Sequence, residues 1–228
     1  NSGMQLLIIR PWLFLNWMAT AQWMLHTRYF RKLNRAAVLS ENKKDPVIYL
    51  ALKRTLDIII SATGLLLLSP LFIYVAIRIK FSSNGPVLYT QERVGHKGRK
   101  FTMLKFRSMY VNAENGVPQL SANNDTRVTP WGRTMRKWKL DELAQLWNVL
   151  KGDMSIVGPR PEREFYIRQI EQRQKSYEYL LQVKPGVTSM GMIKFGYAGN
   201  VDEMTTRMNY DYEYLRKRSL GLDLKIMM

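Results

Sequence analysis

The sequence predicts a small α/β domain that is held at a membrane surface by a kinked, re-entrant helix and by amphipathic surface helices. Three patterns predict this class. The apolar run 58–79 is long enough for a bilayer, but Ser69 and Pro70 lie near its centre. Residues 87–94 and 100–109 have the pattern of two strands joined by a short turn. Apolar residues at helical spacing predict a helix over about 140–150.

Residues 1–46 are predicted to form a membrane-associated segment that ends in a linker. The uncharged stretch 11–25 is too short to span a bilayer comfortably. Its tryptophans and the basic residues after it suit a helix in the membrane interface, namely Trp12, Trp17, Trp23, Arg28, Arg31, Lys32 and Arg35. Packing of this segment against the main domain is the alternative. The polar sequence ENKKDP at 41–46 has the composition of a linker.

Residues 47–83 are predicted to form the membrane helix, bent at Ser69 and Pro70. Pro70 has no amide hydrogen to donate to the carbonyl of Leu66, and the Ser69 hydroxyl can supply a local hydrogen bond instead. Both flanks of the apolar run are basic, and basic flanks favour the cytoplasmic side. A helix that enters and leaves through one leaflet places both flanks there. A kinked full span and a buried core helix of a soluble domain are the alternatives.

Residues 84–228 are predicted to form the main domain. On its second strand, Lys105 and Arg107 alternate with other side chains, so both cations should leave the sheet on one face. They are candidates to meet phosphate, and a solvated basic face is the alternative. The polar stretch 115–129 predicts a mobile loop close to the substrate. Within it, Asp125 and Arg127 are expected to serve local structure.

Asp141 and Glu142 lie in the first turn of the helix predicted over 140–150. Its buried stripe comprises Leu143, Leu146, Trp147 and Leu150. The helix dipole stabilises a carboxylate in this turn, and Arg136, Lys137 and Lys139 add to that, so Asp141 should be ionised at neutral pH. An ionised Asp beside cations can attack phosphorus and form an aspartyl-phosphate. Two ordinary first-turn acids are the alternative.

Arg160 is held between two prolines in the sequence SIVGPRPE. Pro159 and Pro161 restrict the backbone on both sides, so the guanidinium is aimed. An aimed Arg is a natural bidentate partner for a phosphate or a carboxylate, and we expect Arg136 and Arg160 to be the phosphate clamps. The alternative is that Pro161 merely opens the next helix, predicted over 162–181, with Arg160 as solvated surface.

The 228-residue chain carries a formal net charge of +17 and contains no cysteine. This charge fits anionic lipids, a diphosphate substrate and nucleic acid alike. The lack of cysteine excludes a disulfide framework and a thiolate metal site. RNA-type aromatic signatures and a helix-turn-helix pattern are not evident, so nucleic acid is not expected as a partner. Arg54 and Asp57, three residues apart, predict an ion pair at the membrane edge.

Four ordered blocks of the sequence resemble the monotopic phosphoglycosyl transferases, the bacterial sugar transferase superfamily. The blocks are KRTLDIIISATGLLLLSPLF, VLYTQERVGHKGRKFTMLKFRSM, LDELAQLWNVLKGDMSIVGPRPE and LGLDLKIM. Together they cover about 53–228. One segment departs from the pattern of the family, which usually continues its Pro-Gly turn into Trp-Ala-Gln and Asn-Gly-Arg. Here KPGVT is followed by SMGMIKFGYAG, which leaves the sugar open.

The resemblance implies an enzyme at the cytoplasmic face of the bacterial inner membrane, with 84–228 as its catalytic domain. It implies that Asp141, paired with Glu142, attacks the β-phosphate of a UDP-sugar, that UMP leaves, and that polyprenyl phosphate then takes the sugar-phosphate from Asp141. The implied cofactor is Mg²⁺, with Asp141 and Glu142 as its ligands. The implied process is the first membrane step of bacterial glycoconjugate synthesis.

The implied partners are the UDP-sugar, polyprenyl phosphate and membrane lipids. The oligomeric state, including a homodimer, stays open. The alternative function is a basic membrane-surface or nucleic-acid-binding protein without catalysis. Such a protein needs the cations, but it gives no reason for LDE beside GPRP.

Overall fold

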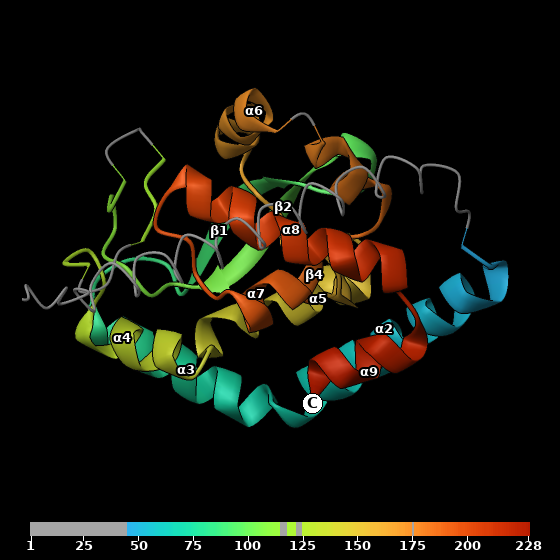
Figure 1. The fold of residues 1–228 in the computed structure, drawn as a ribbon. Helices are drawn as coiled ribbons and strands as arrows, with labels where there is room; N and C mark the ends of the chain where they lie inside the picture. Colours follow the sequence, from blue (N-terminus) through green and yellow to red (C-terminus); the bar gives the residue numbers. More distant parts are fainter. Residues whose placement is uncertain (1–44, 115–117, 122–124, 175) are drawn as a thin grey trace, which may run out of the picture.

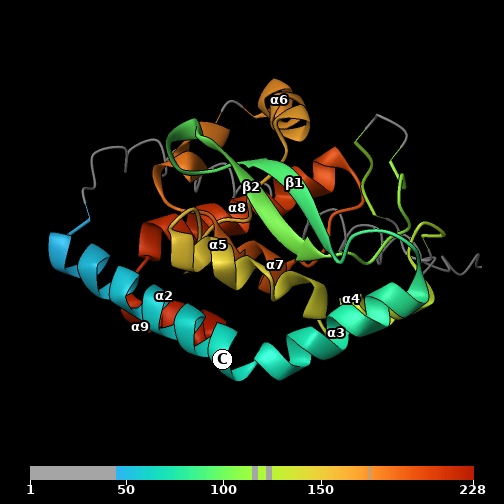
Figure 2. The same cartoon turned by 180° about the vertical axis from the view of Figure 1, so that it is seen from behind.

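The computed structural model describes residues 45–114, 118–121, 125–174 and 176–228. The predictions for 1–44 and for parts of the loop 115–129 therefore lie outside the described residues. The described chain combines helices with two small sheets, as the sequence predicts. Helices α2 and α3 form a wide V along one side of the molecule, and the strands lie on the inner side of the V (Figure 1). Figure 2 shows α9 beside α2 and α4 beside α3.

The V is the predicted kinked helix. Helices α2 (Val47–Leu67) and α3 (Ser69–Ser82) are bent by 61° at the break between them. The Ser69 hydroxyl donates to the Leu66 carbonyl at 2.8 Å, which confirms the predicted replacement for the bond that Pro70 cannot make. Among the described residues, no single helix is long and apolar enough to cross a membrane, and α2 and α3 meet that test only as a bent pair.

The outer surface of the V is apolar. Along α2 and α3 the large apolar side chains exposed in the structure are Val47, Ile48, Leu50, Leu52, Leu56, Ile58, Ile59, Leu66, Leu67, Ile73, Ile77 and Phe81. We call this set the apolar face. It explains why the run is apolar in sequence although little of it is buried in the domain.

The first half of α2 is attached to the rest of the domain by polar contacts. The Lys53 ammonium donates to the Val157 carbonyl at 2.9 Å. Asp57 is buried, and its Oδ1 atom accepts from the Ser155 hydroxyl at 3.0 Å and from the Ile156 amide at 2.9 Å. Two side chains of α2 therefore hold the segment that leads into the Pro-Arg-Pro turn.

The predicted ion pair between Arg54 and Asp57 is wrong. Arg54 donates to the carbonyl oxygens of Val149 and Leu150, at 2.7 and 2.8 Å. These carbonyls belong to the last turn of α5 (Gln145–Lys151), and that of Val149 also accepts from the Gly152 amide at 3.0 Å. Both side chains turn toward the domain, because Arg54 binds the carbonyls at the end of α5 and Asp57 binds the Ile156 amide.

Strands β1 (Leu88–Val94) and β2 (Lys100–Phe106) form an antiparallel pair, as predicted. Leu88 lies opposite Phe106, and the turn between the strands contains the short helix η1 (His96–Gly98). Apolar side chains from this ribbon, including Met103 and Phe106, are buried. The ribbon therefore supports the side chains that leave its other positions.

Strands β3 (Ser155–Val157) and β4 (Gly186–Thr188) form a parallel pair, and their backbones approach closely at two glycines. A Cβ atom at Gly186 would lie 2.1 Å from the Gly158 amide nitrogen, and one at Gly158 would lie 2.4 Å from the Lys184 carbonyl oxygen. Neither position has room for a side chain. The Pro-Arg-Pro turn follows β3 directly, so this contact fixes its base.

The helix predicted over 140–150 is present only in part. After α4 (Pro130–Lys137) the chain forms one 3₁₀ turn, η2 (Leu140–Glu142), and α5 starts only at Gln145. Because the two pieces do not share one helical period, the predicted stripe is wrong at one position: Leu146 is buried, but Trp147 is 53% exposed.

The remaining elements are α6 (Glu164–Arg173), η3 (Tyr177–Gln182), α7 (Met190–Lys194), α8 (Val201–Lys217) and α9 (Leu220–Met227). Of these, α6, η3 and α7 pack with α8 in a helical layer, and α9 lies beside α2 (Figure 2). The single helix predicted over 162–181 is wrong, because Gln174 adopts an extended conformation and ends α6.

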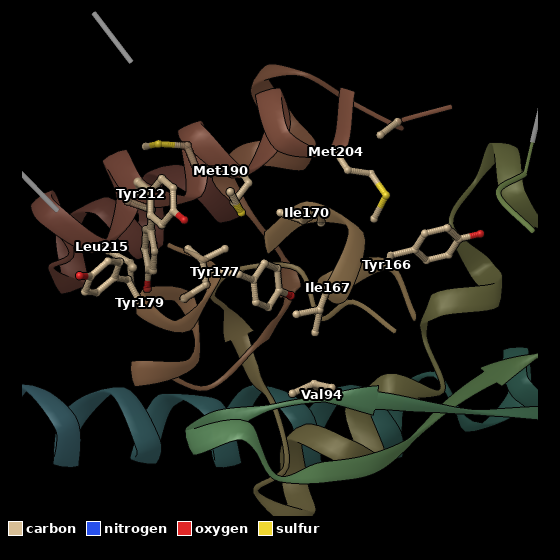
Figure 3. Packing of buried hydrophobic residues seen from close by; sticks show 14 of the residues in the cluster. Val94, Tyr166, Ile167, Ile170, Tyr177, Tyr179, Met190, Met204, Tyr212 and Leu215 are labelled. Carbon is tan, nitrogen blue, oxygen red and sulfur yellow. The ribbon is translucent and has the colours of Figure 1, made fainter. Parts of the chain in front are cut away.

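The main hydrophobic core lies between this helical layer and the end of β1. Figure 3 shows Ile170 of α6, Tyr177 of η3, and Met204 and Tyr212 of α8 together, with Val94 at the strand. The break after α6 lets the chain turn back and bury Tyr177, which a continuous helix would carry away from α8.

Candidate active site

The turn between α4 and α5 carries the two predicted carboxylates. The Thr129 side chain caps α4 by accepting from the Gly132 amide at 2.9 Å. After α4, Lys139 adopts a left-handed backbone conformation with φ of 56°. The chain then enters η2, where Asp141 and Glu142 are only 6% and 8% exposed. Both carboxylates therefore face the interior, unlike ordinary first-turn acids on a solvated helix.

Glu142 is held by two cations. Its Oε1 atom accepts from Arg160 at 2.7 Å and from Lys105 at 3.1 Å. Burial alone would raise the pKa of Glu142, but Arg160 and Lys105 outweigh burial and hold that pKa well below its usual range. Burial lowers the pKa of Lys105, and Glu142 opposes this effect. The structure thus brings two predicted phosphate ligands, Lys105 and Arg160, together at the carboxylate of Glu142.

Asp141 differs from Glu142 in its surroundings. Its Oδ1 atom is buried and has no hydrogen-bond partner. Burial raises the pKa of Asp141, whereas Lys105 lowers it. The predicted position in the first turn of an α-helix is wrong, because Asp141 lies in the short turn η2 and α5 starts only at Gln145. A buried carboxylate oxygen without a partner is uncommon in proteins and is a candidate to receive a ligand.

The turn that carries Arg160 is anchored by two further acids. The Arg160 amide donates to Asp211 Oδ2 at 3.4 Å, and burial raises the pKa of Asp211 to about 6. Glu162 is buried between Arg207 and Arg93, the latter at 3.2 Å. The prolines restrict the turn locally, and these acids fix it to α8 and to the strand pair.

The two other predicted phosphate ligands have different surroundings. Arg136 donates through Nε to the Ser108 hydroxyl at 2.9 Å, and its charge lowers the pKa of Asp141, so it belongs to the site. Arg107 lies one residue beyond β2 and donates to the carbonyl oxygens of Ser83 and Asn84, at 2.7 and 2.6 Å. The structure does not bring Arg107 beside Lys105 at the dyad, because its guanidinium binds the backbone that follows α3.

The expectation that Asp125 and Arg127 serve local structure agrees with the structure. Arg127 binds Asp125 bidentately, with Nε to Oδ1 at 2.8 Å and Nη2 to Oδ2 at 2.6 Å. The pair fixes the chain where it returns to α4.

One residue at the site was not predicted. Tyr197 lies between α7 and α8, and its hydroxyl accepts from the Lys139 ammonium at 2.6 Å. The Arg160 guanidinium carbon lies 5.9 Å from the centre of the same ring. The only sequence signal was that Tyr197 falls in the segment SMGMIKFGYAG, which departs from the family pattern.

Comparison with known proteins agrees with this geometry. The family described as bacterial sugar transferase matches residues 48–228. The chain belongs to this family. The match includes the bent helix pair, both carboxylates and the Pro-Arg-Pro turn, so the resemblance seen in the sequence is confirmed.

Similar members of the bacterial sugar transferase family are known by their activities. An Aeromonas hydrophila protein, UDP-N-acetylgalactosamine-undecaprenyl-phosphate N-acetylgalactosaminephosphotransferase, is 40% identical over 79% of this chain and 43% of its own length. UDP-glucose:undecaprenyl-phosphate glucose-1-phosphate transferase of Escherichia coli is 41% identical over 77% of this chain and 38% of its own. This chain therefore spans only about two fifths of the length of these two relatives.

A third relative is covered over most of its length. The exopolysaccharide production protein ExoY of Sinorhizobium fredii is 36% identical, over 77% of this chain and 81% of that protein. The part of the family that this chain represents is thus close to the whole of at least one member.

The site of this family member fits Mg²⁺ only together with a substrate. Among the described residues, no group of three or more His, Cys, Asp or Glu side chains could hold a metal. Mg²⁺ commonly uses one or two carboxylates and completes its shell with waters and substrate phosphates. The partnerless Asp141 Oδ1 atom and the adjacent Glu142 provide such a pair of carboxylates. A diphosphate would supply the missing oxygens.

Proposed function

We propose that this transferase moves a sugar-1-phosphate from a UDP-sugar to undecaprenyl phosphate and releases UMP. The names of the relatives support this donor and acceptor class. The observation that carries the proposal is the buried, partnerless Oδ1 atom of Asp141 beside a carboxylate that two cations already occupy. Two cations hold Glu142 in place through Oε1, whereas Asp141 Oδ1 is buried and has no hydrogen-bond partner, so we assign the attack to Asp141.

The reaction has two displacements at the same phosphorus atom. A carboxylate oxygen of Asp141 attacks the β-phosphorus, the bond to the bridging oxygen breaks, and that oxygen leaves with UMP. The product is an aspartyl-phosphosugar. A phosphate oxygen of undecaprenyl phosphate then attacks this phosphorus, and Asp141 leaves as a carboxylate. Because the first step needs no acceptor, one equivalent of UMP should appear without undecaprenyl phosphate.

The cations prepare the site for this chemistry. Arg160 and Lys105 are fixed by Glu142 before the substrate arrives, so their charges need little reorganisation to meet a diphosphate. Arg136 and Lys105 favour the ionised, attacking form of Asp141 against the effect of burial. Mg²⁺, held by Asp141 and Glu142 together with the diphosphate, would offset the repulsion between phosphates and carboxylate.

We place the enzyme at the cytoplasmic face of the bacterial inner membrane, with α2 and α3 entering one leaflet. The apolar face supports this placement, because monomeric soluble proteins rarely expose so continuous an apolar surface. The attachment of Asp57 to the segment before the Pro-Arg-Pro turn would then hold the site near the lipid phosphates. The step would initiate synthesis of a glycoconjugate such as an exopolysaccharide.

The test is Asp141→Asn in the full chain, which replaces the attacking oxygen but keeps the shape. UMP release from a panel of UDP-sugars should fall to background, while membrane association stays unchanged. A labelled phosphosugar adduct of the unaltered chain should map to Asp141. Asp202→Asn, at a carboxylate with 79% side-chain exposure, is the matched control and should keep full activity. Substantial turnover by Asp141→Asn would rule out the covalent mechanism.

A further inference from the structure

The dyad is preceded by a lysine in a backbone conformation that lysine rarely adopts. Lys139 has φ of 56° and ψ of 20°. Non-glycine residues seldom occupy this region, and when they do so at a site, the surrounding structure compensates the cost. At this position the backbone would favour glycine or asparagine. The contacts of the lysine side chain must therefore offset the cost of this backbone conformation.

Lys139 is fixed by Tyr197. The ammonium donates to the Tyr197 hydroxyl at 2.6 Å and lies 3.9 Å from the centre of the ring, so it makes both a hydrogen bond and a cation–π contact. The same ring lies near Arg160, the cation that holds Glu142. Tyr197 thus joins the chain before the dyad to the Pro-Arg-Pro turn. The Tyr197 side chain is open to solvent, with 56% of the residue exposed.

The contact leaves both side chains able to donate further hydrogen bonds. The Tyr197 hydroxyl accepts from Lys139, so its own proton is free to be donated to a further acceptor. The ammonium has three donors, and within the part of the chain that the structure describes, Tyr197 is its hydrogen-bond partner. Lys139 precedes Asp141 by two residues, and a cation with an adjacent hydroxyl donor forms a pair suited to anionic oxygen atoms.

The loop that carries Tyr197 is held in place at its end. Asn200 caps α8 by accepting from the Glu203 amide at 2.8 Å, and Glu203 in return accepts from the Gly199 amide at 2.7 Å and the Asn200 side chain at 3.0 Å. This reciprocal capping fixes the segment two residues after Tyr197. The ring is therefore positioned by the fold, although it lies at the surface.

We propose that Lys139 and Tyr197 form a clamp for the diphosphate of the donor. In this clamp the Lys139 ammonium binds phosphate oxygen, and Tyr197 positions the ammonium while donating its hydroxyl proton to the same ligand. The identity of the ligand as a nucleoside diphosphate rests on the proposed function. Tyr197 lies in the segment where this sequence departs from the family pattern, so the clamp gives this chain a donor contact of its own.

The experiment measures binding of UDP with Mg²⁺ to the full chain in nanodiscs, by titration calorimetry, alongside the steady-state kinetics of UMP release. Lys139→Met should weaken UDP about tenfold, the loss expected for one charge-assisted hydrogen bond to phosphate. Tyr197→Phe keeps the ring and removes the hydroxyl, and it should weaken UDP about threefold. Both changes should raise KM for the UDP-sugar more than they lower kcat. Lys151→Met, an exposed lysine paired with Asp153, is the matched control.

The double variant tests the positioning role. Because Tyr197 acts partly by holding Lys139, the combined loss should be smaller than the product of the two single losses. A full product would overturn the positioning role, and unchanged UDP affinity in Lys139→Met would overturn the clamp. If the unaltered chain bound UDP and Lys139→Met weakened it, but no UDP-sugar released UMP, the proposed function would fail while the clamp stood. If the unaltered chain released UMP and Lys139→Met bound UDP with unchanged affinity, the clamp would fail while the proposed function stood.

Discussion

Asp57 should be the residue through which α2 contributes most to the stability of the catalytic domain. Its Oδ1 atom accepts two hydrogen bonds, from the Ser155 hydroxyl and the Ile156 amide, and the carboxylate is buried. Hydrogen bonds to a charged group each contribute about 1.5–3 kcal/mol. Asp57→Ala removes both and leaves the Ile156 amide without a partner. We expect the free energy of unfolding to fall by about 3–5 kcal/mol.

The decisive comparison is with Asp57→Asn. Both bonds use the same oxygen atom, and the asparagine side chain keeps one carbonyl oxygen that can accept both. The loss should then be only about 1 kcal/mol, the difference between a charged and a neutral acceptor. For a domain of this size the Tm should fall by roughly 10 °C in Asp57→Ala and by roughly 3 °C in Asp57→Asn.

The assay is thermal unfolding of the full chain in nanodiscs, followed by intrinsic tryptophan fluorescence and by protease susceptibility. Glu171→Ala, at an exposed position of α6, controls for loss of a carboxylate and should shift the Tm by little. Equal destabilisation by alanine and asparagine at position 57 would refute the reasoning, because the charge and not the shared acceptor atom would then decide stability.

Three further predictions follow from the site and the helix pair. A chelator should abolish UMP release and Mg²⁺ should restore it, and full activity in excess chelator would remove Mg²⁺ from the account. Cysteines at the exposed positions Val47 and Phe81, in this cysteine-free chain, should both be labelled from the cytoplasmic side alone, whereas periplasmic labelling at position 81 would indicate a true span. Burial raises the pKa of Asp211 from 3.8 to about 6, so the folded state binds this proton more tightly than the unfolded state. The free energy of unfolding should therefore fall as the pH rises from about 4 to about 6, by up to about 3 kcal/mol. Asp211→Asn should flatten this part of the pH dependence of Tm, and an unchanged slope would show that another group causes it.

Local signals in the sequence were sufficient for several elements. Pro70 predicts the break because it lacks an amide hydrogen, and the structure adds that the Ser69 hydroxyl binds Leu66. The two strands follow from their alternation and from the glycines between them. Each of these depends on residues close together in the chain, where the physical cause is visible in the sequence.

Other features depend on partners far away in the chain. The helix over 140–150 and the burial of Trp147 were predicted from one periodicity, but the 3₁₀ turn at η2 interrupts it. Arg107 alternates with Lys105 along the same predicted strand, yet it donates to the backbone carbonyls of Ser83 and Asn84 after α3.

The roles of Tyr197 and Asp211 had no local signal. Both approach Arg160 from later in the chain, and only tertiary packing places them there. Sequence spacing can indicate which residue types could act together. It cannot show which of them the fold brings within reach.

The contact between Gly158 and Gly186 couples two segments of the chain that are far apart in sequence. Because backbone meets backbone with no side chain between, the base of the Pro-Arg-Pro turn and the start of β4 can move only as one rigid body. Helix α7 follows β4, and the loop with Tyr197 comes after that helix. Alanine at either glycine would therefore shift both turns at once, and Arg160 with them, whereas substitutions in the Tyr197 loop leave this backbone contact intact.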